Sequence, residues 1–275
     1  MEWLRYGTER LRGAGVPDAE TDAFWLLSEV TGLTRSGMFL HGNEIPDAET
    51  AERYEALTAK RAERVPLQHI IGKAYFMGLE FRSDGRTLVP RPDTETLAEA
   101  VLETCGKSGS SLLDLCTGSG CIAVSLAKLG SFYTVTASDI SEDALAAAGE
   151  NAQINGCPGI RFVKSDLFSA LSGCTFDVIT VNPPYIREAV IETLMPEVRD
   201  HDPYIALSGG ADGLVFYRRL AAETAEHLNP GGRIFLEIGY DQAEAVKTLF
   251  ADAGFEEIKI IHDPGGNPRV VICRK

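Results

Sequence analysis

The chain has 275 residues, of which 44% are hydrophobic and 24% are charged, and its 26 basic and 40 acidic residues give a formal net charge of −14. A chain of this length can bury the core of one large α/β domain and a small second one. The acidic balance disfavours a protein that binds nucleic acid tightly, because such a protein is expected to carry a basic face.

Targeting and metal-binding signals are missing from the sequence. The first residues, Met1 to Arg5, lack the basic-then-apolar pattern of a signal peptide, and no apolar stretch approaches the length of a membrane span. We therefore expect a cytoplasmic protein that is not associated with a membrane. The six cysteines form no C-x-x-C pair and have no nearby histidine at metal-ligand spacing, so we expect reduced thiols and no metal site.

Residues 1–66 predict a small all-α bundle. Apolar residues recur at helical spacing in three segments, 3–11, 17–32 and 46–65. Pro17 and Pro46, each followed by an aspartate, open the second and third segments, and Gly32 closes the second. Such a bundle offers a surface but no obvious catalytic group, so we expect it to recognise a substrate.

Residues 67–88 predict a β-hairpin linker. Two apolar runs, 67–71 and 75–81, are interrupted by Gly72 and Gly78, which is typical of short strands joined by a turn. The third predicted domain, residues 89–275, follows directly.

Two prolines, Pro90 and Pro92, predict a stiff turn that leads into a helix. Asp93 is expected to cap the amino end of this helix, and Glu95 is a favourable charge in its first turn. Whether Arg91 and Glu95 also line an active site stays open at the level of sequence.

A glycine-rich loop follows the next predicted strand, residues 110–115, and opens a helix over 121–129. Its glycines would let the backbone approach a ligand closely. The following strand, 133–137, leads to Asp139, about twenty residues beyond the glycines, where a carboxylate can accept hydrogen bonds from both hydroxyls of a ribose. Together these features predict an adenosine site. The loop residues are Cys116, Thr117, Gly118, Ser119 and Gly120.

Two cofactors fit this pattern. Gly118-x-Gly120-x-x-Ala123 also matches the dinucleotide fingerprint, so an NAD enzyme is an alternative. S-adenosylmethionine is favoured because Asp114 could lie near the cationic end of such a ligand, and because the helix after the loop is short. A further strand, 160–163, is followed by Asp166 and Leu167, which we expect to contact an adenine edge and face.

The tetrapeptide Asn182-Pro183-Pro184-Tyr185 carries the predicted chemistry. It follows a β-branched, apolar strand over 176–181, which the two prolines must end, so Asn182 is expected at the carboxyl end of a strand. The Asn182 side-chain oxygen and the Pro183 carbonyl can accept both hydrogens of a planar –NH2 group, and Tyr185 offers a flat face for stacking. A nitrogen held in this way is oriented for in-line attack on a methyl group.

The remainder predicts a seven-stranded sheet with helices on both faces. Residues 186–213 form a long loop of the kind that usually binds a ligand or acts as a lid. The turn over 263–268 is too short for a crossover helix, so the last strand is expected to be antiparallel. The other elements predicted here are helices over 214–228 and 242–253 and strands over 233–238, 256–261 and 269–273.

Taken together, these motifs resemble those of HemK-type (PrmC) methyltransferases, which modify the glutamine side-chain amide of peptide chain release factors. The resemblance covers essentially the whole chain and implies a Rossmann-like class I S-adenosylmethionine-dependent methyltransferase fold. It implies that Cys116 to Gly120, Asp139 and Leu167, with Asn182, hold S-adenosylmethionine. The four residues from Asn182 to Tyr185 would receive the glutamine of a Gly-Gly-Gln loop.

Two positions depart from the family pattern. Members often carry glycine where this chain has Cys116, so we expect no strongly positive φ at that position. Some carry an aromatic residue where this chain has Leu167, which predicts weaker stacking on adenine.

Two other functions remain as alternatives. One is an amino-group methyltransferase that acts on a nucleic-acid base, of the adenine N6 type. The other is a non-catalytic cofactor-binding partner that stabilises an active subunit. For the release factor methyltransferase we expect a monomer.

Overall fold

The computed structural model describes residues 2–41 and 47–275. Met1 and Pro46, both used above, lie outside the described residues. The chain forms two compact units, one of residues 1–73 with 195–201, and one of residues 74–194 with 202–275.

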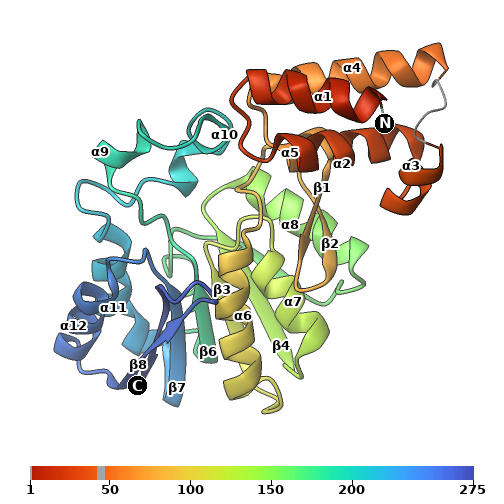
Figure 1. The fold of residues 1–275 in the computed structure, drawn as a ribbon. Coiled ribbons are helices and arrows are strands. Elements are labelled where there is room, and N and C mark those ends of the chain that lie inside the picture. Colours follow the sequence, from red (N-terminus) through yellow and green to blue (C-terminus); the bar gives the residue numbers. More distant parts are fainter. Residues whose placement is uncertain (1, 42–46) are drawn as a thin grey trace. The chain divides into compact units, whose positions relative to one another are not determined.

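The first unit is helical, which confirms the all-α expectation for this region (Figure 1). Leu11, Leu26 and Tyr54 are fully buried in its core, and the Tyr54 hydroxyl donates a hydrogen bond of 3.2 Å to the Ala23 carbonyl. The described helices of this unit are α1 (Glu2–Gly13), α2 (Ala19–Thr31), α3 (Arg35–His41), α4 (Ala48–Ala62), α5 (Leu67–Ile71) and the short α10 (Pro196–Arg199).

The segment 67–71, predicted as a strand, is the helix α5, so that prediction is wrong. Leu67, Ile70 and Ile71 have the i, i+3, i+4 spacing of a helix face, and they pack on the core of the bundle. Gly72 ends α5 in the left-handed conformation, with φ 79°. The β-hairpin therefore begins only at Lys73, with β1 (Lys73–Phe76) and β2 (Leu79–Arg82).

An ion-pair network ties α10 to the bundle. Arg61 donates to Asp22 at 2.7 Å and to Glu197 at 2.8 Å, and Arg64 donates to the other Glu197 oxygen at 2.6 Å. Burial disfavours the charged form of Glu197, but the hydrogen bonds from Arg64 and Arg61 outweigh it and lower the pKa of Glu197 to about 2. Residues from distant parts of the sequence are thus held in one charged cluster.

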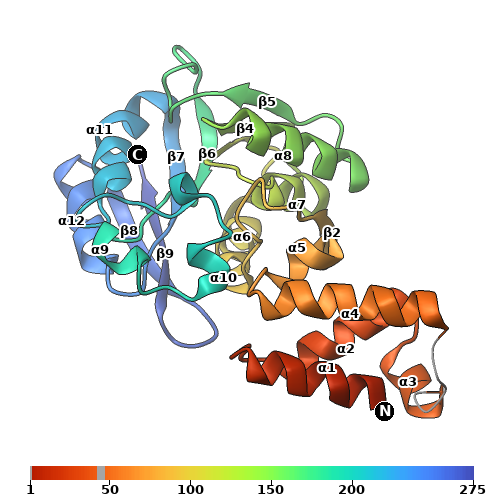
Figure 2. The same ribbon diagram turned by 90° about the horizontal axis from the view of Figure 1, so that it is seen from above.

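The second unit is built on a seven-stranded sheet with the order β5-β4-β3-β6-β7-β9-β8 (Figure 2). The last strand, β9, is antiparallel to both of its neighbours and the other pairs are parallel, as predicted. The strands are β3 (Ser111–Leu115), β4 (Thr134–Asp139), β5 (Arg161–Lys164), β6 (Phe176–Val181), β7 (Leu228–Glu237), β8 (Glu256–His262) and β9 (Pro268–Arg274).

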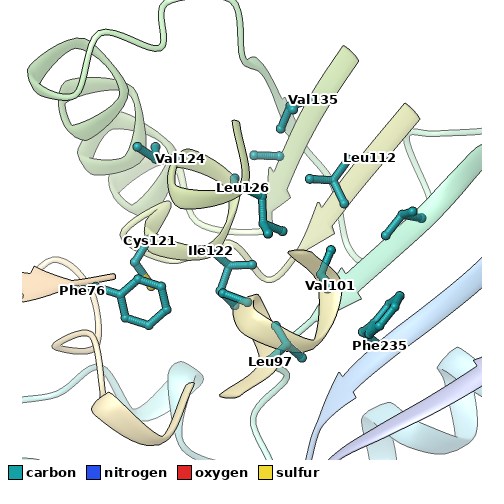
Figure 3. Close-up of a cluster of buried hydrophobic side chains, with 14 of the residues drawn as sticks. Phe76, Leu97, Val101, Leu112, Cys121, Ile122, Val124, Leu126, Val135 and Phe235 are labelled. Atoms are coloured by element: carbon teal, nitrogen blue, oxygen red, sulfur yellow. The ribbon is translucent and has the colours of Figure 1, made fainter. Parts of the chain in front are cut away.

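Helices cover both faces of this sheet. Side chains alternate along the strands, so Leu112 packs with α6–α8 residues whereas Leu113 packs with α11 and α12 residues. Figure 3 shows the first of these cores, with Leu97, Ile122 and Leu112 directed inward. No helix in the described part of the chain is long and apolar enough to cross a membrane. The covering helices are α6 (Pro92–Cys105), α7 (Cys121–Leu129) and α8 (Glu142–Ile154) on one face, and α11 (Val215–His227) and α12 (Ala243–Asp252) on the other.

Two local predictions are corrected. The amino-terminal cap of α6 is Arg91, and Asp93 lies within the first turn, because Pro92 takes the first helical position that suits its fixed φ. The predicted loop 186–213 contains three short helices, which are α9 (Glu188–Ile191), α10 and the 3-10 helix η1 (Tyr204–Ala206).

Candidate active site

The predicted site residues lie at or just after the carboxyl ends of neighbouring strands of the sheet. Leu115, the last residue of β3, pairs with Ser138 of β4 on one side and with Val181 of β6 on the other. The segments that begin at Cys116, Asp139 and Asn182 therefore leave the sheet side by side, at its carboxyl edge. Ligands of open α/β sheets bind at this edge.

The glycine-rich loop and Asp139 are joined by hydrogen bonds. The Gly118 N–H donates to Asp139 Oδ2 at 2.9 Å, and the Ser141 N–H donates to Oδ1 at 3.0 Å. Gly118 has φ 53°, and a Cβ added there would meet nothing within 4 Å, so the loop faces open space at this point. Each carboxylate oxygen keeps a further lone pair for a ligand hydroxyl.

The expectation that Cys116 avoids a positive φ is wrong. Cys116 has φ 54° and Leu167 has φ 48°, so both adopt the left-handed conformation that costs an L-residue about 1–2 kcal/mol. Both follow strands at the carboxyl edge, and strained backbone of this kind gathers at functional sites.

Leu167 is almost completely buried, with 4% of its surface exposed, and packs in the core beside α11. Little of its side chain is therefore available to an adenine ring. Asp166 before it is exposed and accepts a hydrogen bond of 2.8 Å from Arg219.

Asp114 makes its hydrogen bonds within the protein. Its side chain is fully buried, and it accepts hydrogen bonds from the hydroxyls of Thr117 at 2.6 Å and Thr180 at 2.7 Å. Burial raises its pKa to about 6. Through its hydrogen bond from Thr117, the carboxylate holds the start of the glycine loop against the sheet.

Asn182 lies directly after β6, as predicted, and its side chain is oriented by a hydrogen bond. Its Nδ2 donates to the hydroxyl oxygen of Thr94, in the first turn of α6, at 3.3 Å. Because the two ends of an amide point in different directions, Oδ1 faces away from Thr94 and is an acceptor. No described residue donates a hydrogen bond to the Pro183 carbonyl, which leaves a second acceptor beside it.

Tyr185 and the backbone around it are held by contacts that the sequence analysis did not include. The Tyr185 hydroxyl donates to Glu237 Oε1 at 3.2 Å, and Gln242 Nε2 donates to the Tyr185 carbonyl at 3.0 Å. A Cβ added at Gly209 would lie 2.7 Å from Tyr185 Cα and 2.9 Å from the Pro184 carbonyl oxygen. Only glycine permits this close approach of two backbones.

Glu237, the last residue of β7, is a buried acid with only 2% of its surface exposed. Burial raises its pKa to about 7, against the lowering effects of the nearby Arg269 charge and of the hydrogen bond from the Tyr185 hydroxyl. A lone glutamate at the end of an otherwise apolar strand was the sequence signal for this residue. Thr94 and Gly209 gave no comparable signal.

Arg91 and Glu95 both make contacts within the second unit. Arg91 pairs with Asp202 at 2.9 Å, and Glu95 accepts a hydrogen bond from the Met77 N–H at the tip of the hairpin. Each connects α6 to another segment of the chain. Neither contact involves the tetrapeptide.

A cavity of about 690 Å³ lies at the opposite end of the strands, where they begin. It is lined by the amino ends of β3, β4, β5 and β6, and includes none of the predicted site residues. The described residues also contain no cluster of three or more His, Cys, Asp or Glu side chains that could hold a metal ion.

Comparisons with known proteins agree with this architecture. Residues 2–72 match the model of the PrmC N-terminal domain, and residues 92–198 match that of the methyltransferase small domain. A release factor glutamine methyltransferase of Geobacter sulfurreducens is 40% identical, over 98% of this chain and 94% of its own. Another, of Agrobacterium fabrum, is 40% identical over 97% of this chain and 94% of its own.

The solved structure of a methyltransferase from Pyrococcus furiosus has the same kind of fold. The likeness covers 79% of this chain and 98% of that one, with a TM-score of 0.57 and 24% sequence identity.

Proposed function

The chain belongs to the release factor glutamine methyltransferase family, and on this premise we propose how its reaction is performed. The methyl group of S-adenosylmethionine is transferred to the side-chain amide nitrogen of the glutamine in the Gly-Gly-Gln loop of peptide chain release factors. A release factor substrate also supports the expectation of a cytoplasmic protein.

The observation that carries this proposal is the pair of acceptors after β6. Asn182 Oδ1 faces away from Thr94, and the Pro183 carbonyl beside it has no donor among the described residues. Two adjacent acceptors suit a group with two donor hydrogens, which is what a glutamine –NH2 presents. Holding both hydrogens fixes the nitrogen, and orientation of this kind can supply much of a rate enhancement.

The proposed cofactor residues lie around the glycine loop. Asp139 would accept the ribose hydroxyls, and the open side of Gly118 would allow the nucleoside to approach the backbone from Cys116 to Gly120. Leu167 would contribute backbone groups and a small apolar contact. When bound, S-adenosylmethionine supplies an electrophilic methyl carbon.

The residues of the tetrapeptide bind the glutamine amide and orient its nitrogen. Asn182 and Pro183 would hold the amide, Pro184 fixes the direction of the backbone, and the Tyr185 ring would offer a flat face for the amide to stack against. The methylated nitrogen loses one proton to water, so no general base is required for the balance of the reaction.

A labelling experiment tests this function. The protein is incubated with S-adenosylmethionine carrying a radioactive methyl group, together with either a release factor or a bulk nucleic acid. We expect label in the release factor alone, and none in a release factor whose loop glutamine is replaced by alanine. Label in nucleic acid would identify a base methyltransferase. Cofactor binding without label in either would identify a non-catalytic partner subunit.

A further inference from the structure

The buried side-chain amide of Gln242 connects three separate segments at the carboxyl ends of the strands. Its Oε1 accepts a hydrogen bond of 2.9 Å from the Gly239 N–H, and its Nε2 donates to the carbonyls of Tyr185 at 3.0 Å and of Gly213 at 3.1 Å. Only 4% of the surface of Gln242 is exposed. The amide therefore joins the turn after β7, the last residue of the tetrapeptide and the end of the loop 186–213.

The partners of Gln242 allow only one orientation of its amide. A backbone N–H can only donate and a backbone carbonyl can only accept, so Oε1 must face Gly239 and Nε2 must face the two carbonyls. An amide turned the other way would place a donor against a donor and an oxygen against two oxygens. The orientation of Gln242 is thus determined by groups that cannot exchange their roles.

Glycines leave the space that the Gln242 amide occupies. A Cβ added at Gly213 would lie 2.6 Å from Gln242 Nε2 and 2.5 Å from the Tyr185 carbonyl oxygen. A Cβ added at Gly239 would lie 2.9 Å from Gln242 Oε1. All three distances are shorter than van der Waals contact, so a larger residue at either place would displace the amide or the carbonyl.

The hydrogen bond from Gln242 fixes one half of the peptide group that follows Tyr185. The other half of this group, the Ile186 N–H, donates to the Leu207 carbonyl at 3.0 Å. The Tyr185 hydroxyl donates to Glu237 Oε1 at 3.2 Å. The backbone and the ring of Tyr185 are therefore held by different segments of the second unit.

The two prolines of the tetrapeptide make this support important. Pro183 and Pro184 have no N–H, so backbone hydrogen bonds can hold them only through their carbonyls, and the Pro183 carbonyl is the proposed acceptor for the substrate. The rings of both prolines fix φ, so few free rotations separate the Pro183 carbonyl from the peptide group after Tyr185. A restraint on that peptide group therefore also restrains the direction of the Pro183 carbonyl.

We propose that Gln242 is a positioning residue for methyl transfer. It acts through the peptide group after Tyr185, and it keeps the Pro183 carbonyl and the Tyr185 ring where the substrate amide needs them. This inference rests on the proposed function, since it assigns how the same site is held. Both hydrogens of Gln242 Nε2 are used within the protein, so the role requires no contact between Gln242 and the substrate.

Two substitutions that keep the length of the side chain test this role. Gln242→Met removes the donors and the acceptor, and Gln242→Glu replaces Nε2 by an oxygen that faces two carbonyls. At pH 8 each should lower kcat for release factor methylation at least about tenfold, because displaced reacting groups slow catalysis. Affinity for S-adenosylhomocysteine, measured by calorimetry, should change little, because the hydrogen bonds of Gln242 go to none of the proposed cofactor residues.

The pH dependence of Gln242→Glu separates positioning from a simple loss of packing. Burial and the two facing carbonyls disfavour the ionised form of the introduced carboxyl, so its pKa should lie above the ordinary value for glutamate. The protonated carboxyl has one O–H to donate, and it can restore one of the two hydrogen bonds that Nε2 makes. As the pH falls from 8 to 6, kcat of Gln242→Glu relative to the wild type should rise, whereas the same ratio for Gln242→Met should stay constant.

The charged and titratable groups around Gln242 are the same in all of these proteins. Each variant is therefore compared with the wild type at the same pH, which removes the direct contribution of these groups. On the segments that bond to Gln242 or adjoin them, these groups are Tyr185, Arg187 with its partner Asp241, Asp212 with its partner Arg218, Tyr217 on α11, Glu237 on β7, Glu244 on α12 and Arg269 on β9.

Gly239→Ala tests the same contact while Gln242 itself is unchanged. The added methyl group would displace Gln242 Oε1, which is the end of a flexible side chain, so kcat should fall while the fold is kept. Gly149→Ala is the matched control, because a Cβ at that position would meet nothing within 4 Å. Its kcat should equal that of the wild type.

All rates are measured below the thermal midpoint of each variant, and circular dichroism confirms that the protein is folded. If Gln242→Glu does not fold at pH 8, Gln242→Met and Gly239→Ala decide the question through kcat. Wild-type kcat in Gln242→Met, or a kcat of Gln242→Glu that is reduced by the same factor at pH 6 and pH 8, would overturn the inference. Failure of the wild type to label release factor would instead overturn the proposed function itself.

Discussion

Asn182 is the residue on which the proposed reaction depends most directly, and its replacement gives the first prediction. Asn182→Ala removes the side-chain acceptor but leaves the Pro183 carbonyl and the glycine loop in place. Turnover should fall about a hundredfold or more, as when one preorganised hydrogen-bonding group is removed from other active sites. The affinity for S-adenosylhomocysteine should change little. Single-turnover labelling and calorimetry measure the two quantities.

Asp139→Ala is the matched comparison, because it removes a side chain from the neighbouring strand end. Its carboxylate bonds the Gly118 N–H, so its loss should weaken cofactor binding strongly. Normal turnover in Asn182→Ala would exclude the proposed hydrogen bond between Asn182 Oδ1 and the substrate amide. Equal loss of cofactor affinity in both variants would assign Asn182 to the cofactor instead.

At the scale of single residues, the sequence predicted types of chemistry better than backbone conformation. Asn182 and Asp139 lie where the motifs indicated, because prolines and glycines limit the backbone around them. The positive φ of Cys116 and Leu167 could not be predicted, since neither residue prefers it and only the surrounding fold imposes it. Glu237 was not singled out from the sequence, because its neighbours Tyr185 and Arg269 come from other segments of the chain.

At the scale of elements, the packing of the loop after β6 against the tetrapeptide gives the next prediction. Gly209→Ala would bring a methyl group within 3 Å of Tyr185 Cα and the Pro184 carbonyl, both of them backbone. One of the two segments must move, and displacement of reacting groups by about 1 Å can lower the rate about a hundredfold. We expect turnover to drop by that order while the far-ultraviolet circular dichroism stays unchanged.

Gly149→Ala serves as the control. Gly149 lies within α8, and a Cβ there would meet nothing within 4 Å. Alanine favours a helix over glycine by about 1 kcal/mol, so this variant should melt at a higher temperature and keep its activity. If Gly209→Ala is as active as Gly149→Ala, the loop does not fix the tetrapeptide.

Strands and long helices of the second unit were predictable because their apolar patterns are long and regular. The helix α7 has the predicted bounds, Cys121–Leu129, and β6 has the bounds Phe176–Val181. Short segments were less predictable. Leu67–Ile71 has too few residues to distinguish a helix from a strand by pattern alone, and packing on the bundle decided the outcome.

At the scale of the whole molecule, the ion-pair network of the first unit gives the last prediction. Glu197→Ala removes the carboxylate that pairs with the Arg64 guanidinium and with Nη2 of Arg61, and both arginine side chains are mostly buried. Removing one member of a buried pair costs about 3 kcal/mol. Hydrogen exchange should therefore become faster in α4 and in 195–201, while the strands of the second unit keep their protection.

The same network predicts a dependence on acid. The folded-state pKa of Glu197, about 2, is below its ordinary value, so the stabilisation is present above about pH 4.5 and is lost as the pH falls toward 2. Glu197→Ala should remove this part of the acid sensitivity. Glu55→Ala, an exposed change on α4, is the control and should alter stability by less than about 0.5 kcal/mol. Identical exchange in both variants would show that the network does not hold the segment.

The route of the chain between the two units has a mechanical consequence. Residues 186–194 follow Tyr185 within the second unit, the chain enters the first unit at Met195, and it returns to the second unit at Asp202, where Arg91 pairs with it. Nine residues can span about 30 Å at most. Residues 195–201 of the first unit are thus joined by a short stretch of backbone to the tetrapeptide that is proposed to hold the reacting amide. A force that a protein substrate exerts on residues 195–201 would therefore be transmitted through the backbone to the tetrapeptide.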